Sequence, residues 1–286
     1  MATADYRLIR KPEEIGVIKS LRDSALCLQF IRRHADRLGL DPQRVVLMGA
    51  SAGAGTSLWI GTTDDLADPG SADPVLRQST RVSGVVLLET QATYDIGRWS
   101  TDVFPDFGIS VLEGAALLGL EGRLLSFYGI SELADFDSPE ILEYRRRVDM
   151  IELLSSDDPP IFVRNQNQPG EPPVRVNVLF HHANHALVIA NRAREVGFEN
   201  VLYAPVLGIE DPGGEDEINF TLRKLIPRYG REPFSLLREH QGSLLKSKPP
   251  ARAAGSGPRV DHSPPRGDVR RLRRASPGSL PTSPWR

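Results

Sequence analysis

Residues 44–61 read RVVLMGASAGAGTSLWIG, and this stretch decides the fold. It opens with a continuous apolar run, Val45 to Met48, which is typical of a strand buried on both faces of a parallel sheet. A run compatible with a helix follows at once. A buried strand that passes directly into a helix indicates an α/β fold.

The turn between the two runs is Gly49-Ala50-Ser51-Ala52-Gly53. A steric requirement explains why the residues two positions before and after the serine are small. The serine is held in a strained backbone conformation, and bulk at those positions would prevent its hydroxyl from standing clear of the sheet edge. The alternative interpretation is a Gly-rich turn that binds an anion at a helix N-terminus.

The turn matches the Gly-x-Ser-x-Gly nucleophile elbow of the α/β-hydrolases. The preceding segment resembles the esterase and lipase branch of that superfamily, which carries a His-Gly-Gly oxyanion loop. Residues 5–8, Asp-Tyr-Arg-Leu, are similar to a motif after the fourth strand, and a helix over 19–38 and a turn over 40–44 follow in the same order. The resemblance implies a carboxylic-ester hydrolase with an acyl-enzyme on Ser51 and an oxyanion donor at the backbone N–H of Ala52.

The resemblance covers residues 4–61 and also implies that part of the family fold is missing. The first three strands, most of the fourth and the His-Gly-Gly loop have no counterpart here. We therefore interpret the N-terminus as truncated and expect residues 1–10 to be poorly anchored. A catalytically impaired or non-catalytic binding protein, or a fragment of a longer protein, is the alternative function.

The remaining pattern predicts a parallel sheet of four to five strands flanked by helices. Residues 62–80 are rich in Asp, Pro, Ser and Gly and indicate a long loop. Residues 100–155 have helical periodicity and resemble the lid that many family members place over the active site; a packing subdomain is the alternative. Further elements are expected in this order: a strand at 82–89, the entry to another strand at 157–163, a helix at 187–196, a strand at 201–203 and a closing helix at 218–226.

Charge is distributed unevenly along the 286 residues, which carry a formal net charge of −2. Residues 246–286 hold ten Lys and Arg against two Asp, a charge of +8, which leaves −10 for residues 1–245. Eight prolines from residue 247 onward and the absence of apolar periodicity predict a disordered basic tail after a domain of residues 1–245. Such a tail could contact nucleic acid or acidic membranes, but a solvated extension is the simpler reading.

The usual catalytic triad cannot be written from this sequence. A serine needs a histidine base that a carboxylate orients, and the family places the acid after the seventh strand and the histidine after the eighth. Neither place carries the expected residue. A swapped triad remains conceivable, with Ser51 as nucleophile; its candidate bases are His181, His182 and His185, and its candidate acids are Glu210, Asp211 and Glu89.

The histidine cluster has two other interpretations. His182 with His185, or His181 with His185, could bind a metal, but the His-Glu-x-x-His pattern is missing. Otherwise the histidines cap or pack a helix N-terminus. We expect no metal and no cofactor, and a small-molecule ester as the partner rather than nucleic acid.

Composition sets further bounds. The single cysteine, Cys27, excludes an internal disulfide and a cysteine-built zinc site. No apolar run approaches the roughly 20 residues of a membrane span. The N-terminus lacks a signal-peptide pattern, which favours a cytoplasmic protein; because we interpret it as truncated, localisation and oligomeric state stay open.

Overall fold

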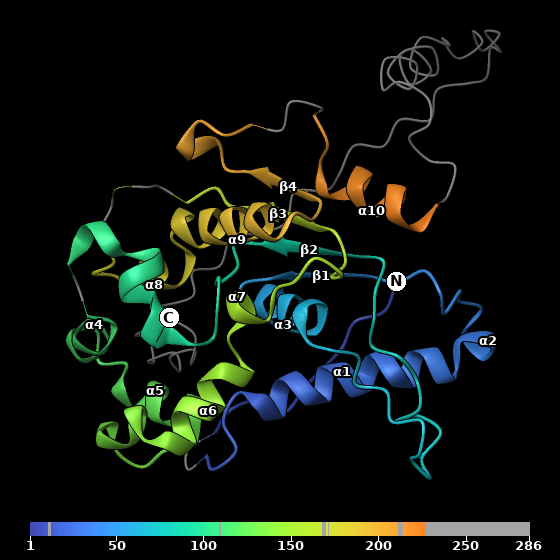
Figure 1. Cartoon of the computed structure of the whole chain (residues 1–286), viewed down its shortest axis with the longest axis horizontal. Coiled ribbons are helices and arrows are strands. Elements are labelled where there is room, and N and C mark those ends of the chain that lie inside the picture. Colours follow the sequence, from blue (N-terminus) through green and yellow to red (C-terminus); the bar gives the residue numbers. More distant parts are fainter. Residues whose placement is uncertain (11–12, 109, 168–169, 171, 211–213, 227–286) are drawn as a thin grey trace, which may run out of the picture. The chain divides into compact units, whose positions relative to one another are not determined.

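The computed structural model describes residues 1–10, 13–108, 110–167, 170, 172–210 and 214–226. They belong to the first of two units of the chain, Met1–Pro233. In this part of the chain, one parallel sheet has the order β1-β2-β3-β4, as Figure 1 shows. Its strands are β1 (Val46–Ala50), β2 (Gly84–Leu88), β3 (Ile161–Arg164) and β4 (Asn200–Tyr203).

Helices connect the strands and fill the long insertion between β2 and β3. The α-helices are α1 (Ile18–Arg33), α2 (Ala35–Leu38), α3 (Ala52–Thr62), α4 (Val111–Leu117), α5 (Glu121–Tyr128), α6 (Pro139–Arg147), α7 (Met150–Leu153), α8 (Val176–His181), α9 (Ala183–Val196) and α10 (Glu217–Leu225). Short helical turns lie at Ile96–Arg98, Trp99–Val103, Pro105–Phe107, Leu133–Asp137 and Pro205–Leu207. The predicted α/β fold, with a parallel sheet flanked by helices, is confirmed.

Both faces of the sheet are covered, as an all-parallel sheet requires. Along β2, Val85 and Leu87 join the main core, which α1, α3 and α9 share, whereas Val86 points to the opposite face. There it packs with Phe162 of β3 and with Phe220 of α10. Figure 1 shows α1 and α3 on one side of the sheet and α10 on the other.

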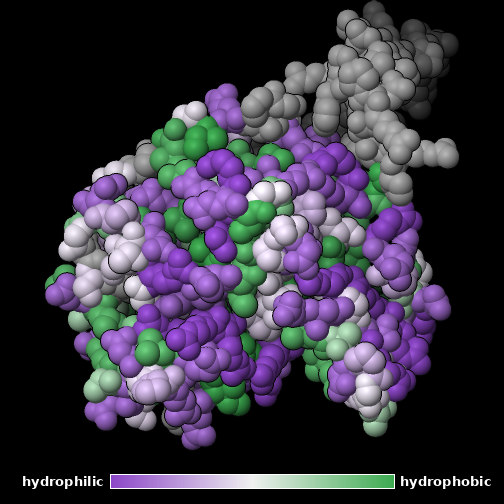
Figure 2. All heavy atoms as spheres, viewed as in Figure 1, coloured by the Kyte–Doolittle hydropathy of each residue, from purple (hydrophilic) through white to green (hydrophobic). Residues whose placement is uncertain are grey.

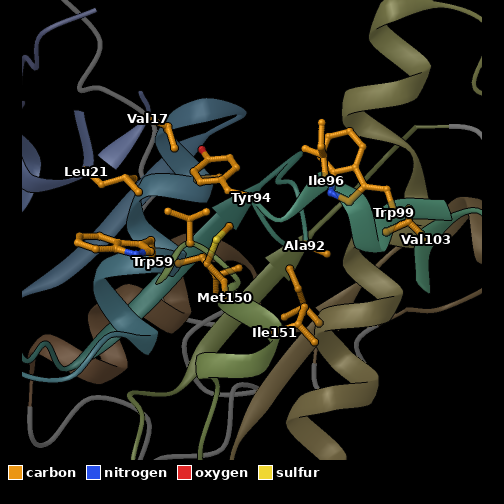
Figure 3. Close-up of a cluster of buried hydrophobic side chains, with 14 of the residues drawn as sticks. Val17, Leu21, Trp59, Ala92, Tyr94, Ile96, Trp99, Val103, Met150 and Ile151 are labelled. Atoms are coloured by element: carbon orange, nitrogen blue, oxygen red, sulfur yellow. The ribbon is translucent and has the colours of Figure 1, made fainter. Parts of the chain in front are cut away.

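The main core continues from the sheet into the helical insertion. Trp59, Tyr94, Trp99 and Met150 are buried there, as the close-up in Figure 3 shows. The insertion supplies further buried residues to the same cluster: Leu120, Leu124, Tyr128, Phe136, Ile141 and Val148. The predicted helical insertion over residues 100–155 is therefore built into the core of the domain.

Two polar contacts tie the insertion to the sheet helices and loops. The hydroxyl of Tyr128 donates to the carbonyl of Tyr94 at 2.5 Å, and the indole N–H of Trp59 donates to the carbonyl of Arg147 at 2.9 Å. Because these donors are buried, each contact also removes the cost of leaving a polar atom unsatisfied.

Strand β1 corrects one prediction. The apolar run was expected to be buried on both faces, but Met48 is 46% exposed. Strand β1 is the first strand in the sheet order and pairs with β2 along one side. An edge strand has fewer covering neighbours, so an apolar run does not by itself distinguish an edge from a central strand.

Residues 1–10 adopt no regular secondary structure, but they are held at Arg7. Asp23 of α1 accepts hydrogen bonds from the Arg7 backbone N–H at 3.0 Å and from the guanidinium at 2.8 and 2.7 Å. The hydroxyl of Ser20 donates to the Arg7 carbonyl at 2.6 Å. The expectation of a poorly anchored segment is thus wrong at this residue.

Helix boundaries show smaller differences. The helix predicted over 19–38 is divided at His34 into α1 and α2. Helix α9 begins at Ala183 instead of residue 187. The basic tail predicted over residues 246–286 lies outside the described residues.

The face of the molecule in Figure 2 is largely hydrophilic, with separate hydrophobic areas between the polar side chains. This mixture is normal, because folded proteins expose a large share of apolar atoms. Among the helices of the described residues, none is long and apolar enough to cross a bilayer.

Candidate active site

Ser51 lies between the end of β1 and the start of α3 in a rare backbone conformation. Its φ and ψ are 52° and −120°, a region that costs a non-glycine residue about 1–3 kcal/mol. The Ser51 N–H donates to the carbonyl of Leu88 at 2.9 Å, which continues the ladder between β1 and β2 by one residue. The strained serine predicted from the sequence is therefore present, at the carboxyl end of the sheet.

The two small residues that flank the serine are not equivalent. A Cβ atom on Gly49 would lie 2.2 Å from the carbonyl carbon of Gly53 and 2.6 Å from the backbone nitrogen of Ala54. A Cβ atom on Gly53 would meet nothing within 4 Å. The steric argument from the sequence is thus right for Gly49 and wrong for Gly53.

His181 is the histidine that reaches the serine. The Oγ atom of Ser51 is 2.7 Å from Nε2 of His181, and Nδ1 of His181 is 2.9 Å from Oδ1 of Asn177. Because the amide oxygen can only accept, Nδ1 carries the proton, and Nε2 is free to accept from the Ser51 hydroxyl. Ser51, His181 and Asn177 thus form one chain of hydrogen bonds.

Helix α8, which ends at His181, is anchored by buried side chains and by a residue of the loop after β3. Val178 and Leu179 of this helix are buried. The side-chain amide of the fully buried Asn165, directly after β3, donates to the carbonyls of His181 and His182 at 3.1 and 3.3 Å. The end of β3 therefore fixes the end of the helix that carries the base.

The environment of His181 keeps its imidazole neutral. Burial lowers the pKa of His181 below its usual value of 6.5, and the backbone of Asn177 opposes this in part. Charged or titratable side chains on the surrounding elements include Arg164, Arg175, His182, His185 and Glu89. A neutral imidazole at pH 7 is the form that can accept a proton.

The structure places the other two histidines in the protein interior. His182 caps α9, and its Nδ1 accepts from the N–H of Asn184 at 3.1 Å. His185 is fully buried; its Nδ1 accepts from the N–H of Ala92 at 3.2 Å, and its Nε2 donates to the carbonyl of Leu179 at 3.1 Å. Burial lowers the pKa of His185 to about 3. Both nitrogens of His185 are thus engaged with the backbone.

The candidate acids do not supply the partner of the base. Glu89, directly after β2, has a positive φ of 53°. Its carboxylate accepts from the backbone N–H of Gln166 at 3.0 Å and from the side chain of Asn167, and burial raises its pKa. Glu210 is exposed, and Asp211 lies outside the described residues.

Asn177 is the site residue that the sequence reasoning missed. The sequence-based hypothesis required a carboxylate, whereas the partner of Nδ1 is an amide one helical turn before His181. The signal that could have found it is the i,i+4 spacing from Asn177 to His181, which places both side chains on one helix face.

The predicted oxyanion donor, Ala52, is the first residue of α3. The first four N–H groups of a helix have no acceptor within the helix, so this position suits a donor to a developing negative charge. Within the described residues, no three histidine, cysteine, aspartate or glutamate side chains are grouped as metal ligands.

Comparison with known proteins agrees with this architecture. Residues 1–95, which include the elbow, match the family model BD-FAE. Among curated proteins no match was found.

Solved structures with a similar fold include three hydrolases. One is a bifunctional GH43-CE protein of Bacteroides eggerthii, with 17% identity and a TM-score of 0.50 over 73% of this chain and 27% of that one. Another is an acetyl ester-xyloside bifunctional hydrolase from Caldicellulosiruptor lactoaceticus, with 20% identity and a TM-score of 0.47 over 84% and 70%. The third is the esterase Est2 of Thermogutta terrifontis with propionate bound, with 17% identity and a TM-score of 0.44 over 84% and 70%.

At these identities the structural likeness bears on the fold alone. The strained serine after β1, the parallel sheet and the family match over residues 1–95 all lead to one assignment. The described residues have an α/β-hydrolase-type fold, and residues 1–95 match the BD-FAE family model.

Proposed function

We propose that this protein hydrolyses a carboxylic ester of a small molecule through an acyl-enzyme on Ser51, with His181 as the general base. The observation that carries the proposal is the 2.7 Å contact between Ser51 Oγ and His181 Nε2 in a strained elbow. The BD-FAE match and the esterase names of structural neighbours support the ester as the substrate class.

The proposed reaction has two halves. The Ser51 oxygen attacks the ester carbonyl carbon while its proton passes to Nε2 of His181. The N–H of Ala52 donates to the carbonyl oxygen as it becomes negative. When the intermediate collapses, the proton moves from His181 to the leaving alkoxide, which departs as the alcohol.

Water completes the cycle by the same route. It attacks the acyl carbon of the ester on Ser51 and gives a proton to His181. His181 returns that proton to the serine oxygen, and the carboxylic acid is released. The proposed net reaction is ester and water to acid and alcohol.

The state of the base sets the expected pH dependence. His181 accepts a proton only when neutral, so the rate is constant above its pKa and falls as pH drops through it. Because burial lowers this pKa below 6.5, the acid limb should have its midpoint below 6.5. Full activity is therefore expected at neutral pH.

Labelling with a fluorophosphonate probe, alongside hydrolysis of p-nitrophenyl acetate, tests the proposal. We expect the full chain to be labelled, Ser51→Ala to abolish labelling, and His181→Gln to slow it by roughly 10²-fold or more. Ser57→Ala, which removes a hydroxyl from the same helix, and His34→Gln serve as matched controls that keep full labelling.

Two results would contradict the proposal. Labelling that persists in Ser51→Ala would place the nucleophile elsewhere. A chain that is folded by circular dichroism but neither labelled nor active would favour the non-catalytic binding protein.

A further inference from the structure

We propose that Asn177 is the positioning residue of His181, so that this site uses a neutral amide where a hydrolase triad usually has a carboxylate. The inference rests on the proposed function, because a positioning role has meaning only if His181 is the base. It adds a residue that acts through the imidazole and does not touch the ester.

The geometry places Asn177 directly behind the base. Its Oδ1 lies 2.9 Å from Nδ1 of His181, while Nε2 on the other side of the ring lies 2.7 Å from the serine oxygen. The two residues are four apart on α8, one helical turn. Asn165 and the buried side chains of α8 anchor the helix that carries both residues.

The hydrogen bond selects the productive tautomer. With the amide oxygen at Nδ1, the imidazole proton resides on Nδ1 and the lone pair on Nε2 faces the hydroxyl of Ser51. If the amide turned over, its NH₂ group would donate to Nδ1. The proton would then reside on Nε2, and His181 could not accept one from the serine.

An amide selects the histidine tautomer less reliably than a carboxylate does. A carboxylate presents acceptors only, so it cannot select the wrong tautomer, and its charge stabilises the imidazolium that forms during reaction. Asn177 is also exposed, so water competes for the hydrogen bond. A positioning residue of this kind should make an enzyme that is slow and that a single substitution can improve.

The charged and titratable groups on the elements beside His181 are Arg164 at the end of β3, Arg175 before α8, His182 and His185 at the start of α9, and Glu89 after β2. Arg164 is paired with Glu217, and the Glu89 carboxylate accepts from Gln166 and Asn167. A carboxylate placed at residue 177 would therefore be a direct anionic neighbour of Nδ1. Opposite charges at such distances shift a histidine pKa upward by about 1–3 units.

The test compares Asn177→Asp with Asn177→Leu in the full chain. Two quantities are measured: the second-order rate of fluorophosphonate labelling as a function of pH, and the titration of the His181 ring by NMR, assigned by its loss in His181→Gln. Val176→Asp adds the same charge one residue away, on a different helix face, and is the matched control. Circular dichroism verifies that each variant folds.

We expect opposite effects from the two substitutions. Asn177→Asp should raise the plateau labelling rate severalfold and move the His181 titration and the acid limb upward by about one pH unit. Asn177→Leu should lower the plateau rate about tenfold without that upward shift. Val176→Asp should change neither quantity by a comparable amount.

Three outcomes would overturn the inference. They are equal effects of Asp and Leu, an effect of Val176→Asp as large as that of Asn177→Asp, and a shifted His181 titration with an unchanged labelling rate. Failure of the proposed function looks different: the unmodified chain is then not labelled at Ser51 at all, whereas the NMR titration still reports whether residue 177 contacts the ring.

Discussion

The elbow of residues 49–53 and the corner of residues 177–185 between α8 and α9 meet at one hydrogen bond, yet they are built in different ways. The turn of the elbow depends on a close local approach, that of Gly49 to the backbone of Gly53, and one bond from the Ser51 N–H to Leu88 joins it to β2. The corner is fixed by Asn165 and Ala92, which come from distant parts of the chain. Local sterics therefore shape the turn at Ser51, whereas tertiary contacts alone place His181.

The largest effect is expected from breaking the elbow. Gly49→Ala should lower the free energy of unfolding by about 3 kcal/mol and abolish fluorophosphonate labelling, because the new Cβ meets backbone atoms that cannot move aside. Gly53→Ala should keep labelling and leave stability equal or up to about 1 kcal/mol higher, since Ala favours the helix. Urea unfolding and labelling of the two variants check this difference, and equal losses in both would show that the asymmetry is not real.

An intermediate effect is expected from the interior of the corner. His185 has a folded-state pKa of about 3, below the ordinary 6.5, so the unfolded chain binds its proton first as pH falls. The contribution of neutral His185 to the free energy of unfolding is fully present above pH 6.5. As the pH falls from 6.5 toward 3, this contribution decreases by roughly 1 kcal/mol for each pH unit. Urea unfolding at pH 7 and pH 5 measures this loss.

His185→Asn separates this contribution from those of other groups. Asn keeps an acceptor for the N–H of Ala92 but cannot be protonated, and it loses the aromatic contacts with Trp99 and Phe104. The variant should be about 1–3 kcal/mol less stable at pH 7 and lose less on acidification. His34→Asn is the control, and parallel pH dependence in the wild type and His185→Asn would exclude His185 as the source.

The smallest effect is expected where one exposed ion pair holds a segment to the domain. Asp23→Asn should leave the thermal midpoint unchanged, because exposed ion pairs contribute little to global stability. It should nevertheless speed trypsin cleavage after Arg7, whose backbone and guanidinium both bond to that carboxylate. An unchanged cleavage rate would mean that the contact from Ser20 suffices.

The same contrast explains what the sequence could predict. The strand, the strained serine and the helix after it followed from residues 44–61 because their geometry is local. The sequence could not show that Met48 lies on an edge strand, because covering neighbours come from elsewhere in the chain. The sequence offered three histidines as candidate bases, but the contact of His181 with Ser51 depends on the pairing of β3 and on Asn165, which no spacing encodes.

The partner of the base was missed for a chemical reason. Glu89, Glu210 and Asp211 are the carboxylates that follow strands in the sequence, and they were the predicted acids. The side chain at Nδ1 is instead the amide of Asn177, four residues before His181. A search of the same helix face for any acceptor would have included it.

Ser51 and Glu89 follow Ala50 and Leu88, which are paired across β1 and β2, so two strained non-glycine residues stand side by side at the edge of the sheet. Each holds about 1–3 kcal/mol of backbone strain. At this carboxyl end of the sheet, selection for thermal stability and selection for turnover are therefore expected to oppose each other. Selection for higher thermal stability should enrich substitutions that relieve the backbone strain at residues 51 and 89. At residue 51 each such gain in stability would remove the proposed nucleophile.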